Sequence, residues 1–304
     1  MGERKKDTKY IVCVLLSGCL WGTMGFFRRR MGDMGLSSLG IVMLRCGISA
    51  LLFAVTILFS DPASIRIRLQ DVWCFIGSGL CSLLFFSACY FQAMTVMSLS
   101  AAAILLYTAP CFVMLLSAIL FREKITGKKL LAMVLAFAGC CLVSGIVGSD
   151  MRITFAGFLY GLGSGIGYAL YSVFGKLAMA RGYRSNTINF WSCLLAAAGA
   201  GIGWGFRQPL SVLGASPGNC IFTVAAAIVT TYLPYLLYTY GLSGIEAGRA
   251  SVMASVEPVV ATIVGLLFFG EKLTGWSALG IVLVLAAVVL LNGSVSKKGD
   301  TKHA

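Results

Sequence analysis

The stretch Pro110–Gly127, PCFVMLLSAILFREKITG, is followed 148 residues later by Pro258–Gly275, PVVATIVGLLFFGEKLTG. Both copies run from a proline through an apolar segment to the polar string E-K-x-T-G. Two apolar segments can resemble each other through composition alone, but a polar string at a fixed distance from a proline does not arise in that way. The repeat therefore predicts a chain that is made of two homologous halves.

The identities continue beyond this stretch. At the same offset, five residues of the next apolar segment meet identical residues: Leu131, Val134, Leu135, Ala138 and Leu142. With an offset shorter by one residue, Ser17-Gly18 meets Ser164-Gly165 and Phe27 meets Phe174. The duplication thus covers most of the chain.

The composition places both halves in a membrane. Hydrophobic residues make up 59% of the 304 residues and charged residues 12%, and the mean hydropathy is +0.91. Soluble domains contain about 45–50% apolar residues, glycine included, and about 25% charged residues. A soluble fold of this composition would lack the polar surface needed to cover its core, so the sequence predicts an all-α membrane protein.

A helix that crosses the bilayer needs about 20 mostly apolar residues. Ten segments meet this requirement: 10–27, 38–59, 72–93, 99–121, 130–147, 155–175, 187–206, 220–240, 248–269 and 276–293. Each half contains five spans, an odd number, so halves that fold alike must insert with opposite orientations. We expect ten transmembrane helices in two inverted five-helix repeats, an arrangement that places a substrate site near the midplane between the repeats.

The predicted repeats cover 1–147 and 155–293, with a connecting loop at 148–154 and a polar tail at 294–304. If the N-terminus is inside, about 17 Lys and Arg residues lie in inner segments and about 6 in outer loops. We therefore expect a multi-pass protein of the cell (plasma) membrane with both termini in the cytoplasm. The run Arg28–Arg30 falls on the predicted outer side, and the sequence pattern offers no reason for it.

Several kinds of chemistry are excluded. The net charge of +13 does not indicate nucleic-acid binding, because the basic residues form short runs between apolar spans. The one histidine, His303, lies in the C-terminal tail, which excludes a histidine triad or a histidine-bound metal within the membrane. The 11 cysteines lie mostly in apolar spans, where we interpret them as packing residues. No Walker motif is present, and we expect no enzyme activity, no cofactor and no metal.

A set of motifs is distributed over both halves: Trp21-Gly22, Arg45, Pro110 followed by Arg122-Glu123-Lys124, Glu257-Pro258, and Gly270–Gly275. In these motifs the chain resembles the EamA-type ten-helix transporters of the drug/metabolite transporter superfamily, over about residues 10–293. The resemblance implies a carrier of small metabolites, such as amino acids, sugars or nucleotide sugars, in which spans five and ten are peripheral. The first half departs from the second in having Ala109 where the second has Glu257, so carboxylate chemistry is one-sided.

Arg45 and Glu257 are the ionisable residues, tyrosine and cysteine aside, that lie well inside predicted spans. A charge in this position costs about 2.5–3.5 kcal/mol on insertion scales and faces the interior of the bundle. Arg45 is a candidate anchor for a substrate carboxylate, and Glu257 for a substrate amine or a proton. The alternative is structural: the two residues form a buried pair, or each caps backbone groups that Pro258 frees.

The other candidates for substrate binding are aromatic residues within spans, away from the interfacial belts: Trp21, Tyr90, Tyr107, Tyr168, Tyr171 and Tyr238. A buried phenol needs a hydrogen-bond partner, so these residues also suit contacts between helices. Pro110 and Pro258, at equivalent positions, are candidate hinges or static kinks. A ridge of small residues in the sixth span (Gly157, Gly161, Gly165 and Ala169) matches Gly18 and Gly22 in the first, which predicts close packing of these two spans.

We therefore predict a secondary-active transporter, an exporter or exchanger, of small polar or amphipathic metabolites such as amino acids or their derivatives. It would work by alternating access. The alternatives are proton-coupled efflux of cationic drugs through Glu257 and, from another class, a membrane enzyme or scaffold without transport. The expected partners are a small-molecule substrate and the lipid bilayer, but no nucleic acid. The sequence leaves proton coupling and homodimer formation open.

Overall fold

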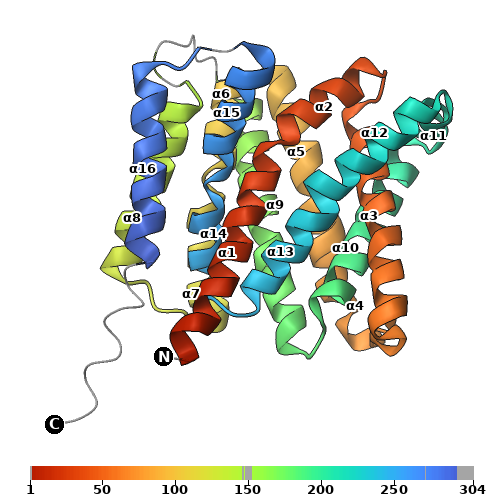
Figure 1. Ribbon diagram of the computed structural model, residues 1–304, viewed down its shortest axis with the longest axis horizontal. Coiled ribbons are helices and arrows are strands. Elements are labelled where there is room, and N and C mark those ends of the chain that lie inside the picture. Colours follow the sequence, from red (N-terminus) through yellow and green to blue (C-terminus); the bar gives the residue numbers. More distant parts are fainter. Residues whose placement is uncertain (1, 146, 148–152, 271, 293–304) are drawn as a thin grey trace.

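The computed structural model describes residues 2–145, 147, 153–270 and 272–292. Most of the predicted connecting loop and all of the predicted tail lie outside these residues. The described elements are all helical. They form a bundle in which α1 (Gly2–Gly22) begins at the same end where α16 (Gly275–Asn292) finishes (Figure 1).

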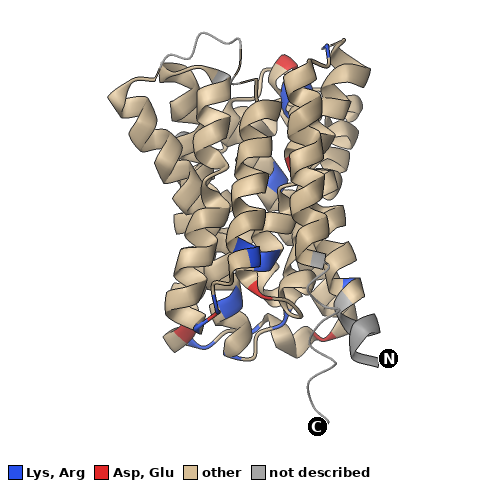
Figure 2. Cartoon of the chain, turned by 90° about the vertical axis from the view of Figure 1, so that its left-hand side faces the viewer, with Lys and Arg blue, Asp and Glu red and all other residues tan. Residues whose placement is uncertain are grey.

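Within the described part of the chain, six helical segments are long and apolar enough to cross a membrane: Thr8–Asp33, Ser38–Ser60, Leu69–Val96, Ser100–Phe121, Pro217–Leu242 and Ala247–Phe269. The other predicted spans coincide with α8 (Gly127–Val143), α9 (Phe155–Ala180), α10 (Ser185–Trp204) and α16. Figure 2 shows charged segments gathered mainly near the two ends of the bundle, with more of them at the end where α1 begins. The chain is a multi-pass membrane protein.

The fourth and ninth predicted spans are each divided into two helices: α6 (Leu99–Leu106) and α7 (Ala109–Phe121), and α14 (Ala247–Ala254) and α15 (Glu257–Phe269). Pro110 and Pro258 lie in the first turn of the second helix of each pair. A proline there removes no intrahelical hydrogen bond, so the predicted kinks are breaks between helices. Their role as hinges stays a prediction.

The third and eighth spans each contain a π-helical turn at equivalent positions. Their elements are α4 (Val72–Ser78), η3 (Gly79–Leu84) and α5 (Phe85–Val96), and α12 (Pro217–Ala227), η4 (Ile228–Tyr232) and α13 (Leu233–Leu242). Turns of this kind occur frequently at functional sites. The two halves thus depart from regular helix geometry at the same two places: a π-helical turn in the third and eighth spans, and a break in the fourth and ninth.

The sequence predicts that the two small-residue ridges pack against each other. In the structure they pack instead against the broken helices. A Cβ added to Gly18 of α1 would lie 2.9 Å from the carbonyl oxygen of Ala254, and one added to Gly165 of α9 would lie 3.5 Å from that of Leu106. Ala254 and Leu106 are 148 residues apart. Equivalent contacts therefore join the first span of each half to the broken span of the other half.

Two glycines bring α8 and α16 close together. A Cβ on Gly139 would lie 2.7 Å from the carbonyl oxygen of Gly280, and one on Gly280 would lie 2.6 Å from that of Gly139. Gly139 also lies against Val284, and Gly280 against Val143, so the helices cross in antiparallel fashion. They begin at opposite ends of the bundle (Figure 1).

The rest of the bundle surrounds this framework. The second span is α3 (Ser38–Ser60), which packs along α10 and α12, while α2 (Met24–Asp33) and the short α11 (Arg207–Gly214) lie at the upper end in Figure 1. The 3₁₀ turns η1 (Pro62–Ile65) and η2 (Leu69–Asp71) connect α3 to α4.

Candidate substrate-binding site

A cavity of about 430 Å³ lies between the two halves. Its lining extends from Trp21 and Tyr168 to Arg29 of α2 and Phe269 at the upper end of α15 (Figure 1). Cavities of this size accommodate a small metabolite. Six of the eight predicted substrate-binding residues line it: Trp21, Arg45, Tyr90, Tyr107, Tyr168 and Glu257.

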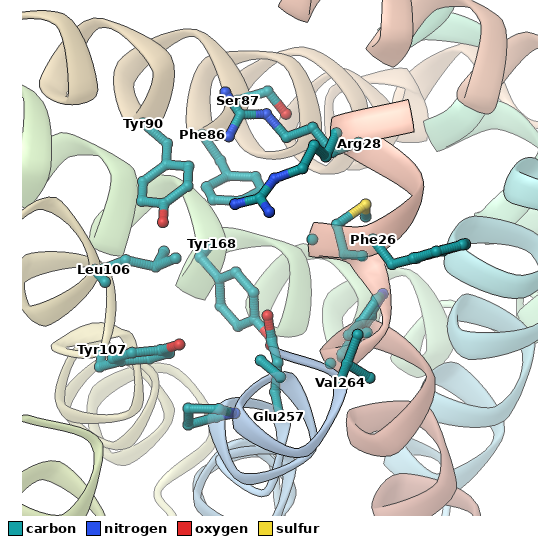
Figure 3. A pocket seen from close by; sticks show the side chains of 18 of the residues that line it. Phe26, Arg28, Phe86, Ser87, Tyr90, Leu106, Tyr107, Tyr168, Glu257 and Val264 are labelled. Atoms are coloured by element: carbon teal, nitrogen blue, oxygen red, sulfur yellow. The ribbon is translucent and has the colours of Figure 1, made fainter. Parts of the chain in front are cut away.

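Glu257 is the one carboxylate among the described residues that line the cavity. As the first residue of α15 it lies at a helix N-terminus, where the helix dipole favours a negative charge. The Tyr168 hydroxyl donates a hydrogen bond to Glu257 Oε2 at 3.5 Å. Figure 3 shows Tyr107 near this pair. The site therefore offers one acidic group, with hydroxyl groups beside it, to a cation or a proton.

Arg45 is held by protein groups at each of its three guanidinium nitrogens. Nε donates to Thr231 Oγ1 at 2.9 Å, Nη2 donates to the carbonyl oxygen of Thr230 at 3.3 Å, and Nη1 contacts Met24 Sδ. Both threonines belong to η4. Arg45 thus joins α3 to the π-helical turn of the eighth span, which favours the structural interpretation of this residue over that of a free anchor.

The run Arg28–Arg30 lies in α2, and its first two residues line the cavity. Arg28 Nη1 lies 3.7 Å from Met94 Sδ, and the guanidinium carbon lies 4.8 Å from the ring centre of Phe91. The third arginine of the run is exposed and does not line the cavity. The basic run that the topology pattern leaves unexplained is therefore partly directed into the cavity.

Trp21 is the centre of an aromatic cluster at the deep end of the cavity, within the bundle. Its side chain is 7% exposed, and its ring centre lies 5.2 Å from that of Tyr238, 5.3 Å from that of Tyr235 and 6.2 Å from that of Tyr168. Trp21 and Tyr168 are equivalent in the two halves at an offset of 147 residues. Aromatic walls of this kind suit the apolar body of an amphipathic ligand.

Tyr171 and Tyr238, which the sequence also predicts as substrate contacts, do not line this cavity. The Tyr238 hydroxyl lies 2.7 Å from Ser172 Oγ, and the Tyr171 hydroxyl donates to Asn189 Oδ1. Both side chains are buried and join helices. Their role in substrate binding stays a prediction.

Several lining residues are not singled out by the sequence criteria, among them Met24, Arg28, Phe86 and Tyr235. Met24 and Phe86 give no signal, because their neighbours in the sequence are equally apolar. Tyr235 lies within a span, as the selected tyrosines do, so the same criterion would have found it. For Arg28, the available signal is its place in a basic run on the predicted outer side.

The opposite end of the bundle carries a partly buried ion pair. Lys176 Nζ of α9 lies 2.8 Å from Glu123 Oε1, and the side chains are 23% and 10% exposed. The Glu123 carboxylate accepts hydrogen bonds from the N–H groups of Ala247 at 3.0 Å and Gly248 at 3.4 Å, and Lys176 Nζ donates to the carbonyl oxygen of Ile245 at 3.2 Å. Although Glu123 precedes the fifth span in the sequence, its carboxylate caps the N-terminus of α14 in the ninth span.

Equivalent residues form a related contact at the cavity end. Lys176 Nζ lies 5.8 Å from the ring centre of Phe121, and the Arg29 guanidinium carbon lies 3.9 Å from that of Phe269. At the repeat offsets, Lys176 corresponds to Arg29 and Phe121 to Phe269. Glu271, the counterpart of Glu123, lies outside the described residues. The same cation–aromatic contact therefore occurs once at each end of the bundle.

A bundle of membrane-spanning helices around a charged and aromatic cavity is the architecture expected of a carrier of small molecules. The sequence model of the EamA-like transporter family matches residues 8–145 and again residues 155–293. The chain belongs to this family, and hence to the class of membrane transporters.

Several relatives are similar along the chain. An "Uncharacterized transporter" of Archaeoglobus fulgidus is 28% identical over 281 residues, 91% of this chain and 94% of the relative. The "Uncharacterized transporter YwfM" of Bacillus subtilis is 24% identical over 302 residues, 98% of this chain and 99% of the relative. A "Probable amino-acid metabolite efflux pump" of Salmonella typhimurium is 24% identical over 201 residues, 62% of this chain and 66% of the relative. One solved crystal structure, 17% identical, has the same fold, with a TM-score of 0.81 over 95% of this chain and 99% of that one.

Proposed function

We propose that the chain is a secondary-active transporter, an exporter or exchanger, of small amphipathic metabolites such as amino acids or their derivatives. The observation that carries the proposal is the cavity between the halves, which combines Glu257, arginine side chains and aromatic walls. A zwitterion meets an opposite charge at each of its ionic groups in such a site, and its apolar part contacts the rings. The similarity to a probable amino-acid metabolite efflux pump supports this substrate class.

The transporter consists of two inverted repeats, 1–147 and 155–293. Three observations support this arrangement: the duplicated sequence, the antiparallel crossing of α8 and α16, and the equivalent contacts that α1 and α9 make with the opposite half. Inverted repeats bind their substrate between the halves and open alternately to the two sides of the membrane. With both termini in the cytoplasm, the cavity is directed to the outer side in this conformation.

Alternating access requires that one end is closed while the other is open. The Lys176–Glu123 pair and its contacts with α14 hold the inner end closed in this conformation. When the transporter opens inward, this pair separates. The opposite end of the bundle, where the cavity now lies, then closes around Arg29 and Phe269. The cation–aromatic contact at both ends gives the two states related local structures.

Flux into proteoliposomes tests this function. Purified protein is reconstituted, and the uptake of radiolabelled amino acids and amphipathic derivatives is measured against protein-free vesicles. We expect uptake of at least one compound and a large loss in Glu257→Gln. Glu246→Gln serves as the matched control, because Glu246 is a 46% exposed carboxylate paired with Lys129 and outside the cavity. If no compound enters above the protein-free rate, the proposal is rejected.

A second candidate, proton-coupled efflux of cations, is favoured by Glu257, the one carboxylate among the described residues that line the cavity. Here Glu257 binds a proton and a cationic substrate in turn. The expected result is that a pH gradient drives the uptake of an aromatic amine in the wild type and no longer drives it in Glu257→Gln. Uptake that responds equally to the gradient in both proteins would exclude this coupling.

A further inference from the structure

The charges that line the cavity are not balanced. Among the described lining residues, the three arginines Arg28, Arg29 and Arg45 face one carboxylate, Glu257. The three nitrogens of Arg45 contact protein groups, two of them through oxygen acceptors, and Arg29 lies over the ring of Phe269. Whether the excess positive charge is compensated within the protein therefore depends on the partners of Arg28.

Among the residues that the structure describes, Arg28 has weak partners only. Its neighbours are a thioether and an aromatic ring face, Met94 and Phe91, and none of the described acidic residues forms an ion pair with it. Thioether sulfur is a weak acceptor, whereas a guanidinium carries five N–H donors. Figure 3 shows the guanidinium reaching into the cavity on the side of Phe86 and Tyr90, away from Glu257. Its donors are thus directed into the cavity.

We propose that Arg28 contacts an anionic group of the substrate and sets the specificity of the cavity for amphipathic carboxylates. A planar guanidinium binds a carboxylate through two parallel hydrogen bonds, and a charge removed from water requires such a partner. The carboxylate lies against Arg28, the apolar body of the substrate lies between the aromatic walls, and any ammonium group reaches Glu257. This inference rests on the proposed function and names the substrate class of the same site. It also gives a role to an arginine on the predicted outer side.

Two probes of similar shape and opposite charge distinguish binding of an anionic group from binding of a cationic one. The affinities of purified protein for 3-phenylpropionate, a carboxylate, and phenethylamine, an amine, are measured by isothermal titration calorimetry. In Arg28→Met, which retains an unbranched chain over Phe91, we expect the affinity for 3-phenylpropionate to fall about 10- to 150-fold, the loss of a hydrogen bond to a charged group. The affinity for phenethylamine stays unchanged or rises. Arg28→Lys restores part of the lost affinity, because it returns the charge without the planar fork.

Arg30→Met is the matched control, since it removes an exposed charge from the same run outside the cavity. It should leave both affinities unchanged. An equal loss for the two probes in Arg28→Met would show a structural role and overturn the inference, as would carboxylate affinity that survives in that variant. Failure of the wild type to bind 3-phenylpropionate would overturn it too. Proteoliposome flux keeps the two proposals apart: transport of amines or neutral compounds alone leaves the transporter function standing and removes Arg28 as its selectivity residue.

Discussion

Removal of the Lys176 charge should release the closed end of the bundle. In Lys176→Met the unbranched chain still packs near Phe121, but the ion pair with Glu123 and the hydrogen bond to the carbonyl oxygen of Ile245 are lost. Glu123 keeps its hydrogen bonds to the N-terminus of α14. The substitution therefore weakens the contact of α9 with Glu123 and with the segment before α14. The cap that Glu123 provides to the N-terminus of α14 stays in place.

The magnitude follows from the exposure of the pair. An exposed ion pair contributes about 0.2–1 kcal/mol, and loss of one partner of a fully buried pair costs about 3–5 kcal/mol. With side chains 23% and 10% exposed, the Lys176–Glu123 pair lies between these limits, so we expect a loss of about 1–3 kcal/mol. The ratio of open to closed inner ends then rises about 5- to 150-fold.

Hydrogen–deuterium exchange with mass spectrometry measures this change. We expect amide protection around Ala247 to fall by the same factor in Lys176→Met, because exchange there requires the end to open. Lys129→Met is the control, since it removes a cation at the same end whose side chain is 12% exposed and whose partner Glu246 is 46% exposed; because solvent screens this pair more strongly, its effect should be smaller than that of Lys176→Met. Unchanged protection in Lys176→Met would refute the closing role of the pair, and so would an equal loss of protection throughout the bundle, which indicates general destabilisation.

Two further substitutions test the packing around the cavity. Tyr238→Phe removes the hydrogen bond with Ser172 and should lower the free energy of unfolding by about 0.5–1.5 kcal/mol without a change in transport KM; a raised KM with unchanged stability would instead support the predicted substrate contact. In Gly22→Val, the new Cβ would lie 2.6 Å from the carbonyl oxygen of Glu257 and 2.6 Å from Val260 Cβ. Overpacking of this kind costs about 1–3 kcal/mol, so the melting temperature should fall, and a wild-type melting curve would contradict the close contact of α1 with α15.

The sequence predicts the class of fold because the features that indicate it are long apolar spans and a polar string that occurs in both halves. The E-K-x-T-G strings survive among apolar residues and reveal the duplication, and the family match to both halves confirms the transporter class. The threonines of these strings also cap the helices that follow them: Thr126 Oγ1 accepts from the N–H of Lys129, and Thr274 Oγ1 from that of Ser277. A helix cap depends on three or four consecutive residues, so the local sequence contains all the information that it requires.

Contacts between distant segments are much less predictable. The ridge around Gly165 indicates that some backbone approaches closely, but a stripe of small residues does not specify its partner, and the pairing of the first and sixth spans is wrong. The π-helical turns η3 and η4 have no residue signature in this chain. Arg45 is recognised as unusual from its apolar surroundings, whereas its partners Thr230 and Thr231 are 185 and 186 residues away and are found only through the fold.

The distribution of charge over the halves is itself informative. The scaffold is nearly symmetric, and the aromatic Trp21 of the first half matches Tyr168 of the second. Two of the charged positions that line the cavity are not duplicated: Glu257 corresponds to Ala109, and Arg45 to Cys193. In the proposed inverted-repeat transporter, the site at the junction of the halves meets the same substrate from either side of the membrane, so one copy of each charge is sufficient for both states. A second copy would add the cost of another ionised group within the membrane and gain no further contact with a single bound molecule. One-sided chemistry on a two-fold scaffold is therefore compatible with the proposed alternating access to one substrate.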